Sequence, residues 1–504
     1  MDFLSNLSHG FGIALSPWNL FYAMLGAVLG TAIGVLPGLG PPATIALLLP
    51  ATYKIDPTGA VIMLAGIFYG AMYGGSTTSI LLNIPGEAAS VVTCLDGYKM
   101  ARKGRAGAAL GICAIGSFIA GTISVVGLSL VAPPLAAFAL SFGPPEYFAL
   151  VILGLLMAVY LSQGSVLKGL IMGVLGLLIG MIGLDPVHGA ERFTFGLSRL
   201  TDGVDFVVVT MGFFGITEVL SNVAAPEVRE IFRTTLRGLL PNREEWRRSV
   251  PAVARGSLLG FFIGILPGGG AIISSFIAYA VEKRLSPHPE RFGTGMIEGV
   301  ASPEAANNAA AGSSFIPLLT LGIPGNASIA MIFVALMIHG IRPGPLLIQE
   351  HPDLFWGTVA SMYIGNLMLL ALNLPLVGVW VKLLEVPYRY LAGLVVVMCV
   401  VGAYSVSNSA FDVGLMVFFG ILGYCFRLGG FPAAPLVLAM ILGPQLERSL
   451  QQSLIASRGD LLIFVERPIS AALLGVGALL VLLPWARWAW GRWRGAGGAV
   501  APAG

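Results

Sequence analysis

Charged side chains are scarce in this sequence. They make up 11% of the 504 residues, whereas hydrophobic residues make up 56%. Soluble domains carry about 25% charged residues, so this composition excludes an ordinary water-soluble protein. The stretch from Ala106 to Pro145 contains no Asp, Glu, Lys or Arg, and a helix crosses a bilayer with ~20 apolar residues. We therefore expect an all-α polytopic membrane protein with roughly 11 to 13 crossings and broken segments.

Cysteine is equally sparse. The four cysteines, Cys94, Cys113, Cys399 and Cys425, form no CxxC pair and have no histidine at ligand spacing. This pattern predicts cysteines that pack in the core, without a disulfide or metal role. The first ten residues lack the basic region and the cleavage site of a signal peptide, so we expect the first span to stay in the mature protein.

Catalytic motifs are missing as well. No P-loop, HExxH or GxSxG motif occurs in a context that supports it. The segment from Gly38 to Ala43 matches GxGxxA loosely, but a long apolar run precedes it and two prolines interrupt it, whereas a dinucleotide site needs a strand and then a helix. We therefore predict no enzymatic activity and no cofactor. The net charge of +3 is spread over short connections and predicts no nucleic-acid binding.

Arginine marks one side of the membrane. The longest hydrophilic interval, from Ala225 to Arg255, has more arginines than acids, which places it in the cytoplasm by the positive-inside rule. The tail from Trp485 to Arg494 mixes Trp with Arg, as expected at a headgroup boundary on the same side. We divide the chain into a first membrane half (1–223), a cytoplasmic connecting segment (224–255), a second membrane half (256–494) and a flexible C-terminal tail (495–504).

Two signatures occur twice in the same order. Gly34-Val-Leu-Pro-Gly-Leu-Gly40 returns as Gly264-Ile-Leu-Pro-Gly-Gly-Gly270, and the Gly-Ser to Ile-Pro-Gly string at 75–86 returns at 312–325. The period is far longer than that of soluble repeat proteins, which favours duplication of half a transporter. We expect the two halves to be inverted, although a parallel arrangement is open because the crossings between the copies cannot be counted from sequence.

Each signature contains Pro and Gly at the end of an apolar run. Pro removes a backbone donor and Gly permits unusual backbone angles, so the helix stops. In hydrocarbon the freed backbone groups need partners, which a bound ion, a ligand or a facing helix can supply. The alternative is a simple kink or packing contact, but breaks in matched pairs favour broken, re-entrant hairpins. The predicted hairpin-break residues are Gly38, Gly40, Pro85, Gly86, Gly268, Gly270, Pro324 and Gly325.

Small hydroxyl and amide side chains surround the breaks. Such neutral donors hold a carboxylate without a buried Arg, and weaker binding favours release. The alternative for any single residue is polar bonding between helices. The predicted substrate-binding residues are Ser76, Thr77, Thr78, Asn83, Asn307, Asn308, Ser313 and Ser314. Glu304, together with Ser79 and Asn326, is the predicted site for a coupling cation, Na⁺ or H⁺, and no other metal is expected.

These strings resemble the large membrane subunit of the tripartite tricarboxylate transporter family, the TctA-like proteins. The resemblance is carried by Gly34 to Gly40, Tyr73 to Gly86, Glu304 to Asn308 and Ile316 to Gly325. Long strings of small and polar residues in a fixed order are specific, and the similarity covers nearly the whole chain.

The resemblance implies cation-coupled uptake of tricarboxylates or related small carboxylates across the bacterial inner membrane. Its implied partners are a small four-span membrane subunit and a periplasmic solute-binding protein. It also implies an elevator-like motion of a transport domain against a scaffold. By the same resemblance, the hairpin motifs at Ser76 to Thr78 and Asn307 to Ser314 would form the substrate site.

Two other functions are alternatives to a transporter. An organic-anion channel needs a pore that stays open, and matched helix breaks favour alternating access instead. An intramembrane enzyme needs buried acids, His or Cys close together, and the sequence offers no such group.

Overall fold

A computed structural model describes the arrangement of residues 3–36, 40–162, 165–185, 189–224, 238–268, 270–384, 386 and 388–496. In this part of the chain, regular structure is helical apart from two short antiparallel strands, β1 (Gly183–Leu184) and β2 (Glu191–Arg192). Seven helical segments are long and apolar enough to cross a membrane. The prediction of an all-α polytopic membrane protein is therefore confirmed.

The seven segments are α2 (Pro17–Val35), α4 (Pro57–Leu82), α6 (Ala106–Ala139), the run of α9 (Phe206–Thr210), η4 (Met211–Ile216) and α10 (Thr217–Ala224), α17 (Pro352–Asn373), α19 (Tyr388–Ser407) and α20 (Ala410–Leu428). Shorter apolar helices are α7 (Pro144–Tyr160), α8 (Val166–Gly180), α15 (Ala327–Ile338) and the start of α23 (Pro468–Ala496). The hairpin region adds α3 (Pro41–Leu48), α5 (Val91–Arg102), α11 (Arg243–Gly264), α12 (Gly270–Leu285), α13 (Glu298–Ser313) and α14 (Phe315–Leu321). The remaining elements are α1 (Phe3–Ala14), η1 (Leu49–Lys54), η2 (Ala88–Ser90), η3 (Ser198–Leu200), η5 (Pro289–Arg291), α16 (Leu347–Glu350), α18 (Val377–Leu383), α21 (Ala433–Ala456) and α22 (Ile463–Glu466).

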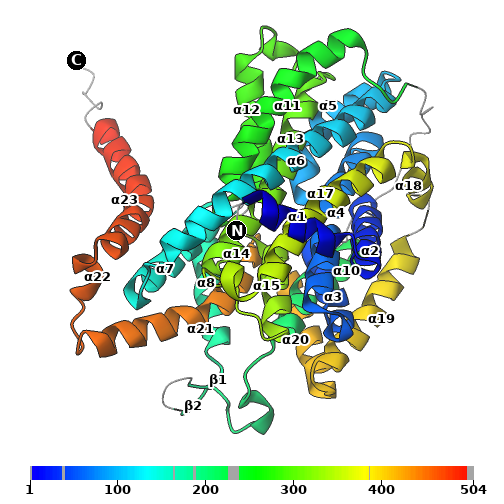
Figure 1. Ribbon diagram of the computed structural model, residues 1–504. Helices are drawn as coiled ribbons and strands as arrows, with labels where there is room; N and C mark the ends of the chain where they lie inside the picture. The colour runs from blue at the N-terminus through cyan, green and yellow to red at the C-terminus, as the bar shows by residue number, and fades with distance from the viewer. Residues whose placement is uncertain are drawn as a thin grey trace, which may run out of the picture.

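Burial separates central helices from peripheral ones. The apolar window of α4 is completely buried, whereas those of α19 and α20 are mostly exposed, as expected for helices that face lipid. Figure 1 shows α22 and α23 at one edge of the molecule, where α7 contacts both. Helix α11 begins at Arg243, inside the interval 224–255 expected to connect the halves, and residues 225–237 and 497–504 lie outside the described residues.

Glycine stripes bring two pairs of helices into backbone contact. In α2 the stripe is Gly26, Gly30 and Gly34, which faces Met63, Ile67 and Ala71 of α4. In α11 it is Gly256, Gly260 and Gly264, which faces Ser302, Ala306 and Ala310 of α13. A Cβ atom added to any of these six glycines would lie 2.2–2.5 Å from a backbone oxygen of the facing helix. Small residues at every fourth position permit this approach in membrane helices.

The two glycine-packed pairs run in opposite directions. Within each pair the contacting residue numbers rise together, so α2 is parallel to α4 and α11 is parallel to α13. Between the pairs the contacting residue numbers change in opposite directions, so α4 and α13 are antiparallel. Ser76 of α4 bonds Glu304 of α13, whereas Phe68, earlier in α4, packs on Phe315, which follows α13. Inverted repeats require that corresponding helices of the two halves run in opposite directions, as these pairs do. The repeat itself stays a prediction.

A buried carboxylate locks α5 to the chain that leads into α13. Asp96 is fully buried and accepts hydrogen bonds from the hydroxyl of Tyr279 (2.9 Å) and from the backbone N–H groups of Gly293 (2.9 Å), Gly295 (2.7 Å) and Met296 (2.8 Å). Asp96 therefore fixes where α13 begins relative to the first half.

The glycine contact predicts a stability loss for Gly260→Ala. The new Cβ would lie 2.2 Å from the carbonyl oxygen of Ala306, so the helices must separate, at a cost of about 1–3 kcal/mol. Thermal melting of the detergent-purified protein should show a lower midpoint. Gly393→Ala in exposed α19 is the control, because no atom of another described segment lies within 4 Å of its added Cβ. Equal midpoints for the two variants would contradict the contact.

The lock at Asp96 predicts that Asp96→Asn is destabilising. An amide offers one acceptor oxygen where a carboxylate offers two, and its NH₂ group would face backbone donors. Hydrogen bonds to a charged group contribute about 1.5–3 kcal/mol, so the melting midpoint should fall clearly. Asp353→Asn, on an exposed residue whose carboxylate bonds only His9 in the described structure, should change it little. If the melting midpoint of Asp96→Asn were as close to that of the wild type as the midpoint of Asp353→Asn is, the lock would be contradicted.

Candidate functional site

The breaks of the first half interrupt helices as predicted. Helix α2 ends at Val35, and Gly40 caps the start of α3, while Gly38 lies outside the described residues. Helix α4 ends where Asn83 adopts a left-handed conformation, with φ of 58°. Ile84 and Pro85 follow, so the chain turns back instead of continuing as a helix.

The second half forms a hairpin at its first break. Helix α11 ends at Gly264 and α12 begins at Gly270, and a Cβ added to Gly270 would lie 2.8 Å from the Cα of Gly264. Further along, an ion pair of 2.5 Å between Arg255 and Glu282 joins the two helices. The two helices are therefore antiparallel and return to the same end of the molecule, as a re-entrant hairpin requires.

The later break of the second half is closed by local caps. Gly322 ends α14 in a left-handed conformation, with φ of 70°. Pro324 follows, and the side chain of Asn326 then accepts a hydrogen bond of 3.0 Å from the backbone N–H of Ile329 at the start of α15. In this structure Asn326 therefore acts as a helix cap, and its predicted role in cation coupling has no further support here.

Within each half the two breaks touch. A Cβ added to Gly86 would lie 2.0 Å from the carbonyl oxygen of Gly34 and 2.6 Å from the Cα of Gly75. In the second half the backbone N–H of Gly268, with φ of 113°, donates a 2.7 Å hydrogen bond to the carbonyl of Gly325. The four sequence signatures thus mark two places where broken helix ends meet.

Glu304 lies at the centre of a buried polar cluster. Its side chain on α13 is 1% exposed, and the hydroxyl of Ser76 on α4 donates to its Oε2 at 2.5 Å. The hydroxyl of Thr93 on α5 donates to its Oε1. In the described part of the chain, Glu304 forms no ion pair with Lys, Arg or His. Neutral donors alone therefore hold this carboxylate.

A second carboxylate, Glu87, belongs to the same cluster. It caps η2 by accepting from the backbone N–H of Ala89 at 2.6 Å, and it accepts from Nδ2 of Asn307 at 3.2 Å. The Oδ1 atom of Asn307 is buried and has no hydrogen-bond partner among the described residues. The predicted Asn307 thus binds a carboxylate of the protein itself.

Asn308 faces a small cavity. Its Nδ2 donates to Oγ of Ser117 (2.7 Å) and to the backbone carbonyl of Glu304 (3.0 Å), whereas its Oδ1 has no partner among the described residues. It lines a cavity of about 20 Å³ together with Tyr69 and Tyr73, and the buried hydroxyl of Tyr69 is also unpartnered in this part of the chain. Buried polar atoms usually have partners, so these atoms single out the lining of this cavity as a candidate site.

A second cavity, of about 10 Å³, adjoins the first through the shared Tyr73. Ser76, Thr77 and Ser117 line it, together with Asn373, whose Oδ1 has no partner among the described residues. Each cavity has room for about one water molecule, whereas small-molecule sites occupy about 300–1,000 Å³. A carboxylate can therefore enter only after the surrounding helices move apart.

Four other predicted residues bond to backbone carbonyls. Thr78 donates to the carbonyl of Val35 at 2.5 Å, which satisfies an end of α2 that the break leaves open. The remaining bonds, within single helices, run from Ser79 to Gly75, from Ser313 to Ala310 and from Ser314 to Ala311. Asn83 is exposed and lines neither cavity. Among the predicted substrate residues, Ser76, Thr77 and Asn308 are the ones that line the cavities.

Sequence reasoning missed the contribution of α17. Asn366 accepts from the hydroxyl of Tyr73 at 2.5 Å and lines one cavity, and Asn373 lines the other. Both amides lie within a long apolar run, and a polar side chain inside a membrane span is itself a signal of function. Thr93 and Ser117 gave no comparable signal, because hydroxyl residues are common in membrane helices.

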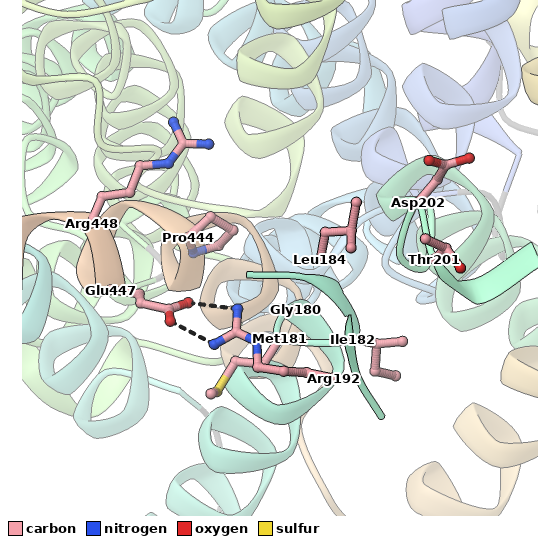
Figure 2. Close-up of a pocket in the computed structure, with 10 residues that line it drawn as sticks. All are labelled: Gly180, Met181, Ile182, Leu184, Arg192, Thr201, Asp202, Pro444, Glu447 and Arg448. Atoms are coloured by element: carbon pink, nitrogen blue, oxygen red, sulfur yellow. Dashed lines mark hydrogen bonds and ion pairs between the residues drawn. The ribbon is translucent and has the colours of Figure 1, made fainter. Parts of the chain in front are cut away.

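A larger pocket opens elsewhere, between the β1–β2 hairpin and α21 (Figure 2). Its volume is about 350 Å³, and Arg192 donates to both carboxylate oxygens of Glu447, at 2.6 and 3.1 Å. These hydrogen bonds raise the pKa of the Arg192 guanidinium above its ordinary value. Arg448 and Asp202 also line this pocket, but none of the predicted site residues does, so we place the candidate site at the two cavities instead.

The chain is similar to known proteins over most of its length. The pattern that defines the Tripartite tricarboxylate transporter TctA family matches residues 20–438. An Agrobacterium vitis protein described as "Uncharacterized 52.8 kDa protein in TAR-I ttuC' 3'region" is 53% identical over 483 residues, which cover 96% of each chain. A second protein of that organism, "Uncharacterized protein in TAR-II ttuC' 3'region", is 53% identical over 224 residues, covering 44% of this chain and 93% of the relative. No solved structure is detectably similar. Since the family pattern covers most of its length, including all four helix breaks, this chain belongs to the TctA family of tripartite tricarboxylate transporters.

Proposed function

We propose that this chain is the translocating subunit of a cation-coupled secondary transporter for tricarboxylates or related small carboxylates. The observation that carries the proposal is the pair of buried cavities between α4, α6, α13 and α17, which hold unpartnered polar atoms. Both cavities lie where side chains from the two halves of the chain meet, which is where transporters with broken helices bind their substrates.

The residues that line the two cavities suit an anion that binds on one side of the membrane and is released on the other. Thr77 and Ser117 bring hydroxyl groups, and the NH₂ group of Asn308 is a further donor close by. No Lys or Arg is among the residues that line the two cavities. Hydroxyl and amide donors bind a carboxylate more weakly than a guanidinium does, so the substrate can leave on the other side.

The small cavity volumes support alternating access. A site with room for about one water molecule is closed, and transport requires that the hairpin helices move against their neighbours. Helices α4, α5 and α13 are tied together by the bonds of Glu304 and Asp96. We propose that these helices move as one body against a scaffold, in an elevator-like motion.

The family name indicates an assembly of several subunits. We propose that the partners are a small four-span membrane subunit and a periplasmic solute-binding protein, and that the complex lies in the bacterial inner membrane. In this arrangement the Arg-rich start of α11 faces the cytoplasm, and the binding protein delivers the carboxylate from the other side.

Uptake by cells that express the chain with its two partner subunits tests the proposal. Labelled citrate and a panel of other di- and tricarboxylates are offered, and accumulation against the gradient is expected for at least one. Asn308→Ala and Thr77→Ala should reduce it by more than about tenfold, a loss of roughly 1.4 kcal/mol or more, while membrane assembly stays intact. Asn83→Gly, which changes an exposed residue and suits its left-handed conformation, should transport normally. Normal uptake by the Asn308→Ala, Thr77→Ala double variant would refute the site.

A further inference from the structure

Two amide side chains contribute hydrogen-bond acceptors to the cavities. The Oδ1 atoms of Asn308 and Asn373 are buried and have no hydrogen-bond partner among the described residues. Each of these residues is 4% exposed and lines one of the two cavities. Buried acceptors are normally satisfied, so these oxygens set a requirement for a ligand that fills the cavities. The requirement is a hydrogen-bond donor.

The orientation of each amide is fixed by its own helix. The Nδ2 atom of Asn373 donates to the backbone carbonyl of Leu369 at 3.0 Å, and also to the hydroxyl of Thr31 at 3.4 Å. The Nδ2 atom of Asn308 likewise donates to the backbone carbonyl of Glu304 at 3.0 Å. A carbonyl only accepts, so turning either amide around would bring two acceptors together. Because each carbonyl belongs to the same helix as its amide, the orientation is kept when the helices move apart.

A carboxylate alone does not meet the requirement for a donor. Small carboxylic acids are ionised at neutral pH, and an ionised carboxylate only accepts hydrogen bonds. Against the Oδ1 atom of Asn373 it would leave the amide oxygen unsatisfied, which costs free energy. A ligand that displaces water from such a site without replacing its hydrogen bond loses affinity for the same reason. The ligand must therefore carry a donor in addition to its carboxylates.

Donors for a carboxylate line the same cavity as Asn373. Thr77 brings one hydroxyl and Ser117 brings a second. The Oγ atom of Ser117 accepts from Nδ2 of Asn308 at 2.7 Å, so its own hydrogen remains to donate to a ligand. The volume of this cavity is only about 10 Å³, so its donors and its acceptor lie close together. The carboxylate and the donor group of the ligand must then be neighbours as well.

The missing donor is a hydroxyl group and not an ammonium group. A buried ammonium needs an acid beside it, and no Asp or Glu is among the described residues that line the two cavities. A hydroxyl is neutral and needs only an acceptor. We propose that the site binds 2-hydroxycarboxylates, whose hydroxyl donates to Oδ1 of Asn373 while the neighbouring carboxylate accepts from Thr77 and Ser117. This proposal rests on the proposed function and names its substrate class.

Matched ligand pairs test the proposal on the purified full-length chain in detergent. No binding protein is added, because it would impose its own selectivity. Thermal melting is followed at neutral pH with malate against succinate, and with citrate against propane-1,2,3-tricarboxylate, and the members of each pair differ only in the hydroxyl. Binding to the folded state raises the melting midpoint in a saturable way. The hydroxylated member should half-saturate at a concentration about tenfold lower or more, because its analogue leaves a buried acceptor unpaired.

Variants assign this preference to one residue. Asn373→Leu keeps a side chain of similar size but removes the acceptor, so it should abolish the difference within each pair. Asn366→Leu is the matched control, because it is the same change in the same helix at an amide whose Oδ1 already accepts from the hydroxyl of Tyr73. This control should bind both members of a pair more weakly and keep the ratio between them.

Three outcomes would overturn the hydroxyl assignment. They are equal half-saturation by both members of each pair in the wild type, a preference that survives Asn373→Leu, and a preference that Asn366→Leu abolishes as well. A stronger response to aspartate than to malate would overturn it too, in favour of an ammonium group.

The proposed function has a separate outcome. Carboxylates that bind equally with and without the hydroxyl, and that cells expressing the transporter accumulate, would leave the proposed function standing without the hydroxyl preference. A chain that neither binds nor accumulates any of the offered carboxylates would refute the proposed function, and the substrate class with it.

Discussion

A helix that ends inside a membrane leaves backbone groups that hydrocarbon cannot solvate, and the centre of this structure depends on how those groups are satisfied. The end of α2 is closed by the hydroxyl of Thr78, which bonds the carbonyl of Val35. The two breaks of the second half close each other through the bond from Gly268 to Gly325. Such ends stay buried only where another broken end or a polar side chain lies within reach, so the breaks meet in pairs, one pair in each half.

Glycine makes that gathering possible. The stripes on α2 and α11 allow their backbones to touch those of α4 and α13, so the helices pack closely within each half. Between the halves, the hydroxyl of Ser76 lies 2.5 Å from the carboxylate of Glu304, although 228 residues separate them. The same close packing leaves cavities of only about 10 and 20 Å³. A structure this tight binds a substrate only by moving whole helices, because packed interiors shift between discrete arrangements rather than deform smoothly.

The acids of the polar cluster differ from other acids of this region in the groups that bind them. Two acids at its centre are held by neutral donors, whereas Arg248 and Arg255 of α11 pair with Glu298 and Glu282. Buried acids that only neutral donors hold favour neutralisation, by a proton or by a bound cation.

The sequence by itself determined the membrane class, the position of the four breaks and the family, because hydrophobic length and Pro-Gly chemistry act locally and need no knowledge of partners. It also predicted Ser76, Thr77 and Asn308, which line the two cavities, and Glu304, which lies in the polar cluster beside them. The glycine stripes are also visible in the sequence, at every fourth residue of two helices. Only the tertiary structure decided which hydroxyl and amide groups face the cavities. Thr78 and Ser79 bond to backbone carbonyls, and Asn83 is exposed. Asn366 and Asn373 of α17 line the cavities. That choice depends on which helix lies opposite each side chain, and helix packing across hundreds of residues leaves no local mark in the chain.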